Sequence, residues 1–181
     1  MKTFLILIFI FANIILLSCS ESTDPNYDND FATIDSLDLN SAIALANEWK
    51  FSRNKISSHI TPKELIIEFP DGRTVKKPLP ANEMYIAVAP YINETHECST
   101  HYPSSCNGEI KEKTFVVTAK DDKGNSIFSG NQTTMKNGFF ELWLPRNLTI
   151  SLHIEYNSLS GDEVIGTFDS NKTCITTIRL R

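Results

Sequence analysis

The sequence has few of the residues that mark non-globular or nucleic-acid-binding chains. Glycine and proline number only 7 and 8 among 181 residues, which excludes a low-complexity or collagen-like chain. Basic residues are not in excess, because 17 lysines and arginines stand against 22 aspartates and glutamates, for a net charge of −5. Nucleic-acid-binding domains usually carry a basic excess, so we expect no nucleic-acid partner. A content of 41% hydrophobic and 22% charged residues is typical of a globular domain.

The amino terminus has no apolar run long enough to cross a membrane as a helix, which takes about 20 residues. A shorter apolar run extends from Phe4 to Leu17, just after the basic residue Lys2. This arrangement is typical of a secretory signal, so residues 1–18 are predicted to be a signal peptide. Export makes the placement of the cysteines informative, because disulfides persist only in oxidising compartments.

The predicted signal ends in Leu16-Leu17-Ser18-Cys19, which resembles a bacterial lipobox. The resemblance implies that Cys19 is acylated and becomes the first residue of a membrane-anchored lipoprotein of the bacterial cell envelope. The polar and acidic residues 19–30 would then form a flexible tether. An ordinary cleaved signal, in which Cys19 has no role, is the alternative.

Residues 31–92 are predicted to form a small α+β domain that contains one helix. Residues Leu39–Lys50 place apolar side chains on one helical face. Asp38 or Asn40 could cap the first turn of this helix, because short polar side chains accept hydrogen bonds from the unpaired backbone N–H groups there.

A few antiparallel strands complete this domain. Lys63–Phe69 and Arg73–Lys77 flank the turn Pro70-Asp71-Gly72, which predicts a hairpin. Met84–Tyr91 is a nearly continuous apolar run, which is typical of a strand buried on both faces.

Residues 93–181 are predicted to form an antiparallel β-sandwich, so that the fold class is α+β. Between Leu148 and Tyr156 apolar and polar residues alternate, which indicates a strand with one face in the core and the other in water. Several short strands with polar turns between them favour a sandwich. The predicted strands are Thr114–Lys120, Phe139–Leu144, Leu148–Tyr156, Glu163–Phe168 and Thr173–Leu180.

The residues that carry chemistry gather in residues 95–109, called the Cys/His loop below. Its proline, serine and glycine residues indicate an irregular backbone that could wrap around an ion. A further thiol, Cys174, lies on the last predicted strand, where it would share a face with Ile178 and Leu180. Cys174 could therefore be a fixed sulfur against which the loop closes. The loop itself contributes His96, Cys98, His101 and Cys106.

Three cysteines remain when Cys19 carries a lipid, and three cannot all pair with one another. One interpretation is a Cys98–Cys106 disulfide with Cys174 buried as a small apolar side chain. Another is a metal site, because thiolates together with imidazoles suit Cu(I) or Zn(II). A Cys/His nucleophile pair is the third, although the chain has no Gly-x-Ser-x-Gly or comparable catalytic signature. The residues alone leave these alternatives open.

Several features together resemble one family. They are the spacing of Cys98, Cys106 and Cys174, the Cys/His loop, the strand Gly138–Pro145 and the ending Thr173-Cys174-Ile175-Thr176-Thr177. In combination they resemble the CueP family of periplasmic copper-binding proteins. The resemblance is densest from about residue 95 to the end and looser, although compatible in length and order, over residues 31–94. The lipobox departs from the family picture, because it would tether a protein that is otherwise soluble in the periplasm.

The resemblance implies an envelope protein, facing the periplasm, that binds copper and serves copper tolerance. It implies Cys98, Cys106 and Cys174 as ligands, with His101 ranked above His96 as the imidazole. The ion would be Cu(I), with zinc as the alternative. The resemblance further implies supply of copper to a copper/zinc superoxide dismutase, two domains per chain, and a homodimer formed through the N-terminal part.

Two other functions stay open. In the first, Cys98 and Cys106 form a thiol–disulfide redox pair that could reduce Cu(II), and a partner thiol reductase would reset it. In the second, the chain is a structural lipoprotein with one disulfide. Because no catalytic signature accompanies the thiols, we expect a binding protein and not an enzyme, with copper reduction as the exception.

Overall fold

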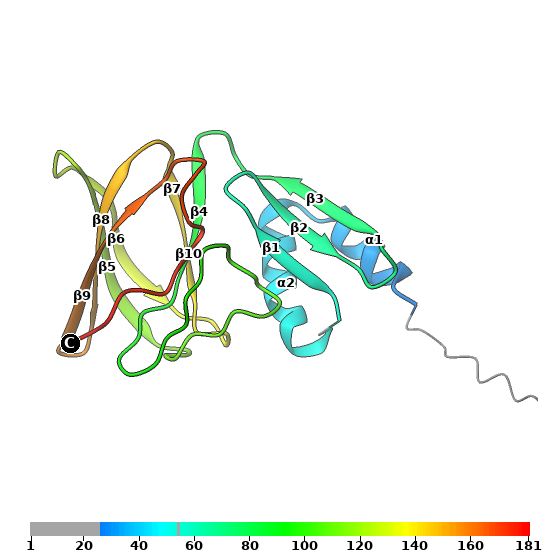
Figure 1. Ribbon diagram of the computed structural model, residues 1–181, viewed down its shortest axis with the longest axis horizontal. Coiled ribbons are helices and arrows are strands. Elements are labelled where there is room, and N and C mark those ends of the chain that lie inside the picture. Colours follow the sequence, from blue (N-terminus) through cyan, green and yellow to red (C-terminus); the bar gives the residue numbers. More distant parts are fainter. Residues whose placement is uncertain (1–25, 54) are drawn as a thin grey trace, which may run out of the picture.

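The computed structural model of the protein describes residues 26–53 and 55–181, which form two helices and ten strands in two lobes lying side by side (Figure 1). The expected α+β fold class is confirmed. The N-terminal lobe contains α1 (Asp28–Ser36), α2 (Leu39–Ser52), β1 (Ser57–Ile60), β2 (Glu64–Glu68) and β3 (Thr74–Pro78). The C-terminal lobe contains β4 (Glu83–Val88), β5 (Thr114–Asp121), β6 (Ser126–Thr133), β7 (Phe140–Pro145), β8 (Thr149–Tyr156), β9 (Leu159–Gly166) and β10 (Cys174–Ile175).

The predicted signal peptide, residues 1–18, lies outside the described residues, as do Cys19 and the first part of the expected tether. Within the described part of the chain, no helix combines the length and the apolar content that crossing a membrane requires.

The last residues of the expected tether are helical, because α1 begins at Asp28. The lobe therefore has two helices where one was expected. This short helix is stabilised by tertiary contacts: Tyr27 and Ile34 are buried in the core, and the Tyr27 ring packs edge-on against Phe69 with 6.1 Å between centroids. Phe31 adds a further contact, with its ring 5.4 Å from that of Phe69 between centroids. A short, mostly polar segment with so few apolar residues gives little periodic signal, so the helix was not predicted.

Helix α2 confirms the predicted helix and continues to Ser52. Asp38 is its N-cap, since its carboxylate accepts a hydrogen bond from the Ser41 backbone N–H at 3.0 Å. This hydrogen bond lowers the pKa of Asp38. The helix packs against β2, and the apolar residues of its buried face are Ala42, Ile43, Ala46 and Trp49.

Strands β1, β2 and β3 form an antiparallel sheet in that order. The predicted hairpin is confirmed, with β2 and β3 joined at Gly72, whose φ of +87° favours glycine. One face of the sheet is buried under the two helices (Figure 1), and its core residues include Ile60, Leu65, Ile67 and Val75.

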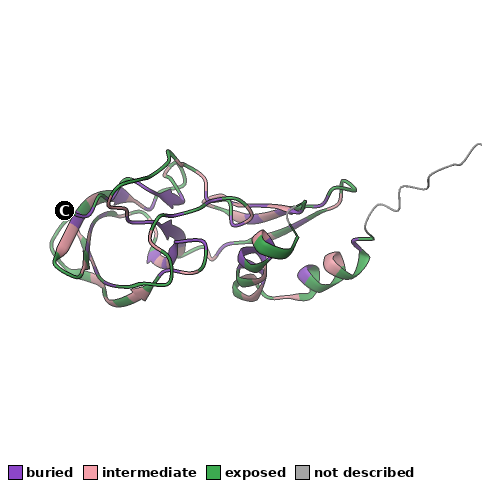
Figure 2. Cartoon of the chain, turned by 90° about the horizontal axis from the view of Figure 1, so that it is seen from below, coloured by how far each residue is buried: buried purple, intermediate pink, exposed green. Residues whose placement is uncertain are grey.

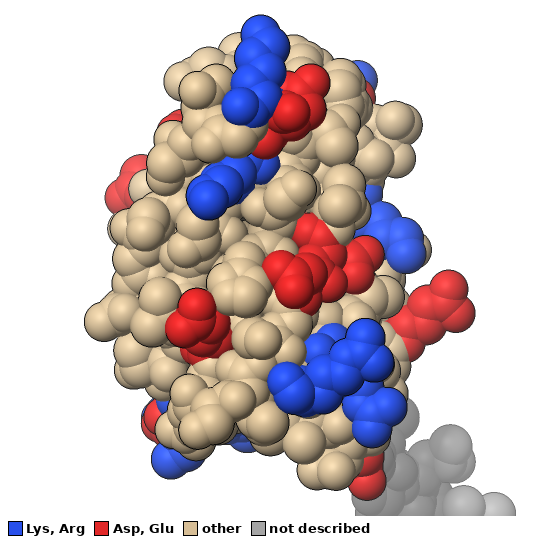
Figure 3. Space-filling view, turned by 90° about the vertical axis from the view of Figure 1, so that its left-hand side faces the viewer, with Lys and Arg blue, Asp and Glu red and all other residues tan. Residues whose placement is uncertain are grey.

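Two sheets form the sandwich of the C-terminal lobe, in the orders β10-β4-β7 and β6-β5-β8-β9. The predicted alternation in β8 is confirmed, because Ile150, Leu152 and Ile154 are buried between the sheets. Figure 2 shows buried residues along the strands and largely exposed residues in the connecting turns. On the side of the lobe seen in Figure 3, acidic and basic side chains form small separate groups.

Strand β4 is buried on both faces, as its apolar run predicts, but its neighbours lie on the far side of the expected boundary at residue 92. It pairs antiparallel with β7 and parallel with β10. One face belongs to the sandwich core and the other to the core shared with the N-terminal lobe. The residues facing the sandwich are Met84, Ile86 and Val88, and those facing the other core are Tyr85, Ala87 and Ala89.

The last strand is much shorter than predicted, since β10 spans only Cys174–Ile175. The chain is irregular beyond it, so the period of two does not extend to Ile178 and Leu180. The expected shared face of these residues is wrong: Cys174 lies in the core between the lobes, whereas Ile178 and Leu180 lie in the sandwich core.

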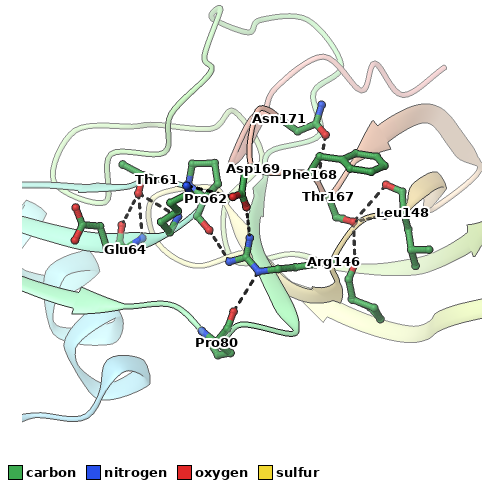
Figure 4. Close-up of polar contacts among 12 residues, drawn as sticks. Thr61, Pro62, Glu64, Pro80, Arg146, Leu148, Thr167, Phe168, Asp169 and Asn171 are labelled. Atoms are coloured by element: carbon green, nitrogen blue, oxygen red, sulfur yellow. Dashed lines mark hydrogen bonds and ion pairs between the residues drawn. The ribbon is translucent and has the colours of Figure 1, made fainter.

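Arg146, just after β7, joins the two lobes (Figure 4). Its guanidinium donates to the Pro62 carbonyl at 2.5 Å and to the Pro80 carbonyl at 3.2 Å, and pairs with the Asp169 carboxylate at 3.1 Å. Pro62 lies between β1 and β2, and Asp169 lies in the connection that leads to β10. One largely buried side chain therefore fixes the N-terminal sheet relative to the connection that carries Cys174.

Candidate metal centre

The Cys/His loop lies between β4 and β5 and extends from the sandwich toward the N-terminal lobe (Figure 1). Strand β1 fixes its middle. The Ile60 backbone N–H donates to the His101 carbonyl at 2.8 Å in an isolated antiparallel bridge. Ser58 and Ser104 each donate a backbone N–H to the hydroxyl of the other, at 3.0 and 3.1 Å. The loop thus continues the edge of the N-terminal sheet for a few residues.

Helix α2 holds the following residues of the loop through one side chain. Lys50, in the last turn of α2, donates from Nζ to the carbonyl groups of Ser105 and Cys106 and to Asn107 Oδ1. Partial burial lowers the pKa of Lys50, while the nearby Cys106 sulfur acts in the opposite direction. The ammonium is therefore placed where it stabilises a thiolate at Cys106.

Residues 173–176, called the C-terminal segment below, are hydrogen-bonded along the other side of the loop. These bonds explain how a thiol so distant in the sequence reaches the loop. They join the Thr173 N–H to the Ser99 carbonyl at 3.0 Å, the Thr176 hydroxyl to the His96 carbonyl at 2.6 Å, and the Thr95 hydroxyl to the Thr176 carbonyl at 2.5 Å.

The buried Thr173 hydroxyl is the point where β1, the loop and the C-terminal segment meet. It donates to the Ile60 carbonyl at 2.6 Å and accepts from the His101 backbone N–H at 3.0 Å. Thr173 precedes Cys174, whose backbone pairs with Ala87 of β4. A single side chain therefore fixes His101 relative to Cys174.

The structure brings the three thiols of the predicted site together, and all three are free. The sulfur atoms of Cys98 and Cys106 are 3.6 Å apart. The Cys174 sulfur, from the C-terminal segment, lies within 4.8 Å of the Cys106 sulfur. Cys106 is therefore the common member of the cluster.

Two groups of three ligands share Cys106. The outer set consists of His96, Cys98 and Cys106, with ligand atoms all within 4.8 Å of one another. All three line a surface pocket of about 540 Å³. His96 is exposed and Cys98 is partly exposed, so solvent reaches this set directly.

The inner set consists of His101, Cys106 and Cys174, whose ligand atoms also lie within 4.8 Å of one another. All three are buried, and neither His101 nor Cys174 lines the pocket. The His101 ring packs against Phe139 at 4.8 Å and Tyr85 at 6.0 Å between centroids. Among the described residues neither ring nitrogen of His101 has a partner within hydrogen-bond distance, although the imidazole lies near enough to the Cys106 sulfur to help lower the pKa of that thiol. Buried polar atoms are nearly always paired, so these nitrogens are suited to an ion that the chain itself does not supply.

The thiols share protons in a way that favours one thiolate. Contacts from the Cys174 and Cys98 thiols lower the pKa of Cys106, and its sulfur also accepts the Tyr102 backbone N–H at 3.4 Å. The hydrogen bond that the Cys98 thiol donates to the Cys106 sulfur raises the pKa of Cys98 to about 12. The same contacts, together with burial, raise the pKa of Cys174. These contacts favour the thiolate form at Cys106 over Cys98 and Cys174, and each thiol that binds a metal must lose its proton.

Lys50 and Thr173 support the site and were not predicted. For Thr173 the only signal in the sequence is that it precedes Cys174. Nothing local to Lys50 indicates that its ammonium reaches the loop, because that contact depends on how α2 packs against the rest of the chain.

Comparison with known proteins gives a family and a related structure for this chain. The sequence model of the family described as periplasmic copper-binding protein CueP matches residues 42–179, which include the Cys/His loop and Cys174. The crystal structure of S.CueP superposes with a TM-score of 0.76 at 31% sequence identity, covering 84% of this chain and 94% of that chain. No curated protein sequence matches the chain significantly.

Proposed function

The chain belongs to the CueP family of periplasmic copper-binding proteins, and on that premise we propose that it holds copper as Cu(I) in the centre between its lobes. The proposed ligands are the thiolates of Cys98, Cys106 and Cys174 and the imidazoles of His101 and His96, which the two sets bring within bonding range of an ion. The proposed role is to sequester Cu(I) and pass it on, which serves copper tolerance.

His101 is the observation that carries this proposal. A neutral imidazole has one donor and one acceptor nitrogen, and burying either without a partner costs free energy. Both nitrogens of His101 are buried and unpaired among the described residues, beside two cysteine sulfurs. An ion bound by these sulfurs and one ring nitrogen would remove part of that cost. A structural histidine would instead be expected to hydrogen-bond to its surroundings.

The type and number of ligands favour Cu(I) over Zn(II). Thiolate and imidazole suit both ions, but zinc in protein sites is almost always tetrahedral with four ligands. Each set offers three ligands, and Cys98 and Cys174 are in different sets. Cu(I) is satisfied by two or three ligands, so either set suffices for it.

The setting in the cell extends the proposal beyond the site. The family is periplasmic, and a lipid on Cys19 would hold this member at a membrane surface. Delivery of Cu(I) to a cuproenzyme such as a copper/zinc superoxide dismutase, and a homodimer formed through the N-terminal lobe, are the further roles that we propose from the family resemblance.

A thiol–disulfide function is the second candidate, and the geometry of Cys98 and Cys106 favours it. Their sulfurs are 3.6 Å apart, and the lowered pKa of Cys106 provides a thiolate. Oxidation of the Cys106 thiolate and the Cys98 thiol to a disulfide releases two electrons and one proton. The two electrons would reduce two Cu(II) ions to Cu(I). A thiol reductase would then restore the pair.

A competition titration tests the proposed function. The reduced exported chain, carrying Cys19→Ser to prevent acylation, is titrated anaerobically with Cu(I) against a chromogenic Cu(I) chelator. We expect one tightly bound Cu(I) per chain. Cys106→Ser should lower the affinity by at least about 100-fold, because even residues that only orient metal ligands cost about 10–100-fold. His101→Gln should cost at least about tenfold on the same basis.

His153→Gln is the matched control, because His153 lies on the exposed face of β8 away from the thiols. It should leave the affinity unchanged. If the wild-type chain does not compete with the chelator, or if His101→Gln and His153→Gln behave alike, the proposed ligand set is wrong.

A further inference from the structure

We propose that Cu(I) occupies two positions in turn: an exchange position formed by the outer set and a storage position formed by the inner set, with Cys106 bound to the ion in both. This inference rests on the proposed function and adds the path by which Cu(I) enters and leaves the site. Its basis is that the two sets overlap in one residue only and differ sharply in their exposure to solvent.

The distances define two positions. Ligands on opposite sides of one ion are separated by at most about 4.6 Å when the metal–sulfur bonds are about 2.3 Å long, as in zinc sites. The ligand atoms within each set lie within 4.8 Å of one another, so a small adjustment lets each set close on an ion. Cys98 and Cys174 belong to different sets, and their thiols also contact one another, so the two positions are neighbours and an ion moves only a short way between them.

Access separates the two positions. The outer set lines the surface pocket, where an incoming thiolate from another protein can reach an ion beside Cys98. Cys174 and His101 are both 0% exposed, so an ion held by the inner set is out of reach of such a ligand. An ion in the storage position must therefore pass the outer set in order to leave, and Cys106 is the only residue in both.

The transfer between the positions is an exchange of ligands without oxidation or reduction. Moving inward, the bonds from copper to the Cys98 sulfur and a His96 nitrogen break, while bonds to the Cys174 sulfur and a His101 nitrogen form. The Cys174 thiol loses its proton and the Cys98 thiolate gains one, so the charge of the cluster is unchanged. Because the Cys106–copper bond persists, the ion is never released to solvent during the step.

The chemistry of the pocket indicates the kind of partner that would use it. A recipient must present at least one soft ligand, a thiolate or thioether, that can enter the pocket and bind Cu(I) while Cys106 and Cys98 still hold it.

The test uses the reduced exported chain with Cys19→Ser, loaded with one equivalent of Cu(I), and measures both the equilibrium affinity and the rate of transfer to an excess of chromogenic chelator. Cys174→Ser should lower affinity by at least about 100-fold, beyond the usual effect of a residue that only orients ligands, and should speed transfer. Cys98→Ser should lower affinity much less and should slow transfer by at least about tenfold, which corresponds to about 1.4 kcal/mol on the barrier. His96→Gln should slow transfer in the same direction.

The sign of the change in rate decides the inference. If Cys98→Ser and His96→Gln speed transfer, as loss of a ligand from a single site would, the two positions do not exist even though copper binding stands. If the wild-type chain binds no Cu(I), the proposed function itself fails. His153→Gln, with its histidine on the outer face of the sandwich, should change neither quantity.

Discussion

Replacing Thr173 with valine removes one hydroxyl from the junction between the lobes and keeps nearly the same side-chain shape. The Ile60 carbonyl and the His101 backbone N–H, which the hydroxyl pairs at 2.6 and 3.0 Å, are then left without a partner in a site that is 1% exposed at Thr173. A buried polar group left unpaired costs about 1–3 kcal/mol. Two such groups should therefore lower the unfolding free energy of the metal-free protein by at least about 2 kcal/mol.

Urea denaturation of the reduced, metal-free chain measures this loss, and the melting temperature should fall by at least about 4 °C in a protein of this size. Cu(I) affinity should fall as well, because Thr173 fixes His101 relative to Cys174. Thr173→Ser is the control, since it keeps the hydroxyl and removes only a methyl group. If Thr173→Val and Thr173→Ser lower the free energy of unfolding and the Cu(I) affinity equally, the hydrogen bonds of Thr173 do not position the inner set.

Arg146→Met should lower the free energy of unfolding by several kcal/mol in urea denaturation. The reason is that the Pro62 and Pro80 carbonyls each lose a buried hydrogen-bond donor, at a cost of about 1–3 kcal/mol each. A loss no larger than that caused by Asp169→Asn would contradict the role of Arg146 in joining the two lobes. Lys50→Met should raise the pKa of the thiolate in the cluster, measured by the pH dependence of alkylation, whereas an unchanged profile would show that the ammonium acts only on the loop carbonyls. The raised pKa of His153, caused first by its hydrogen bond to the Asp162 carboxylate, gives stability that is full below the unfolded pKa of about 6.5 and is lost as pH rises through the higher folded pKa. The stability difference between wild type and His153→Gln should therefore shrink as the pH rises above about 6.5. A difference that grows with pH would show that folding does not raise the pKa of His153.

Much of the fold follows from local signals in the sequence. The cap at Asp38 and the apolar face of α2, the turn at Gly72, and the alternation along β8 each depend on residues close in the chain. In these elements a side chain's surroundings are fixed by its neighbours in sequence, so periodicity and turn chemistry are enough to predict them.

The parts that were not predicted depend on packing between distant residues. Helix α1 forms because Tyr27 and Ile34 enter the core. The apolar run of β4 indicated a buried strand, but which strands pair with it is a property of the sheet and not of the run. The short β10 breaks the alternation that would have placed Cys174 beside Ile178.

The candidate site divides in the same way. The candidate ligands in the Cys/His loop were indicated by its composition, and Cys174 was indicated by its residue type and by the resemblance to a family. The division into an outer and an inner set could not be predicted, since it depends on the bonds from the C-terminal segment to the loop and on the burial of His101. Spacing in the sequence gives the residue types of a metal site, whereas the order in which an ion meets them is fixed by tertiary structure.

X-ray absorption spectroscopy of the reduced chain loaded with one equivalent of Cu(I) tests most directly whether distant thiols bind one ion. With the ion in the inner set, the spectrum should show two sulfur neighbours and one nitrogen neighbour, and Cys98→Ser alone should leave this shell unchanged. Adding Cys174→Ser to Cys98→Ser should leave Cys106 as the one sulfur neighbour. A wild-type spectrum with only nitrogen and oxygen neighbours, or equal spectra for Cys98→Ser and the double variant, would mean that the thiol from the C-terminal segment is not a ligand.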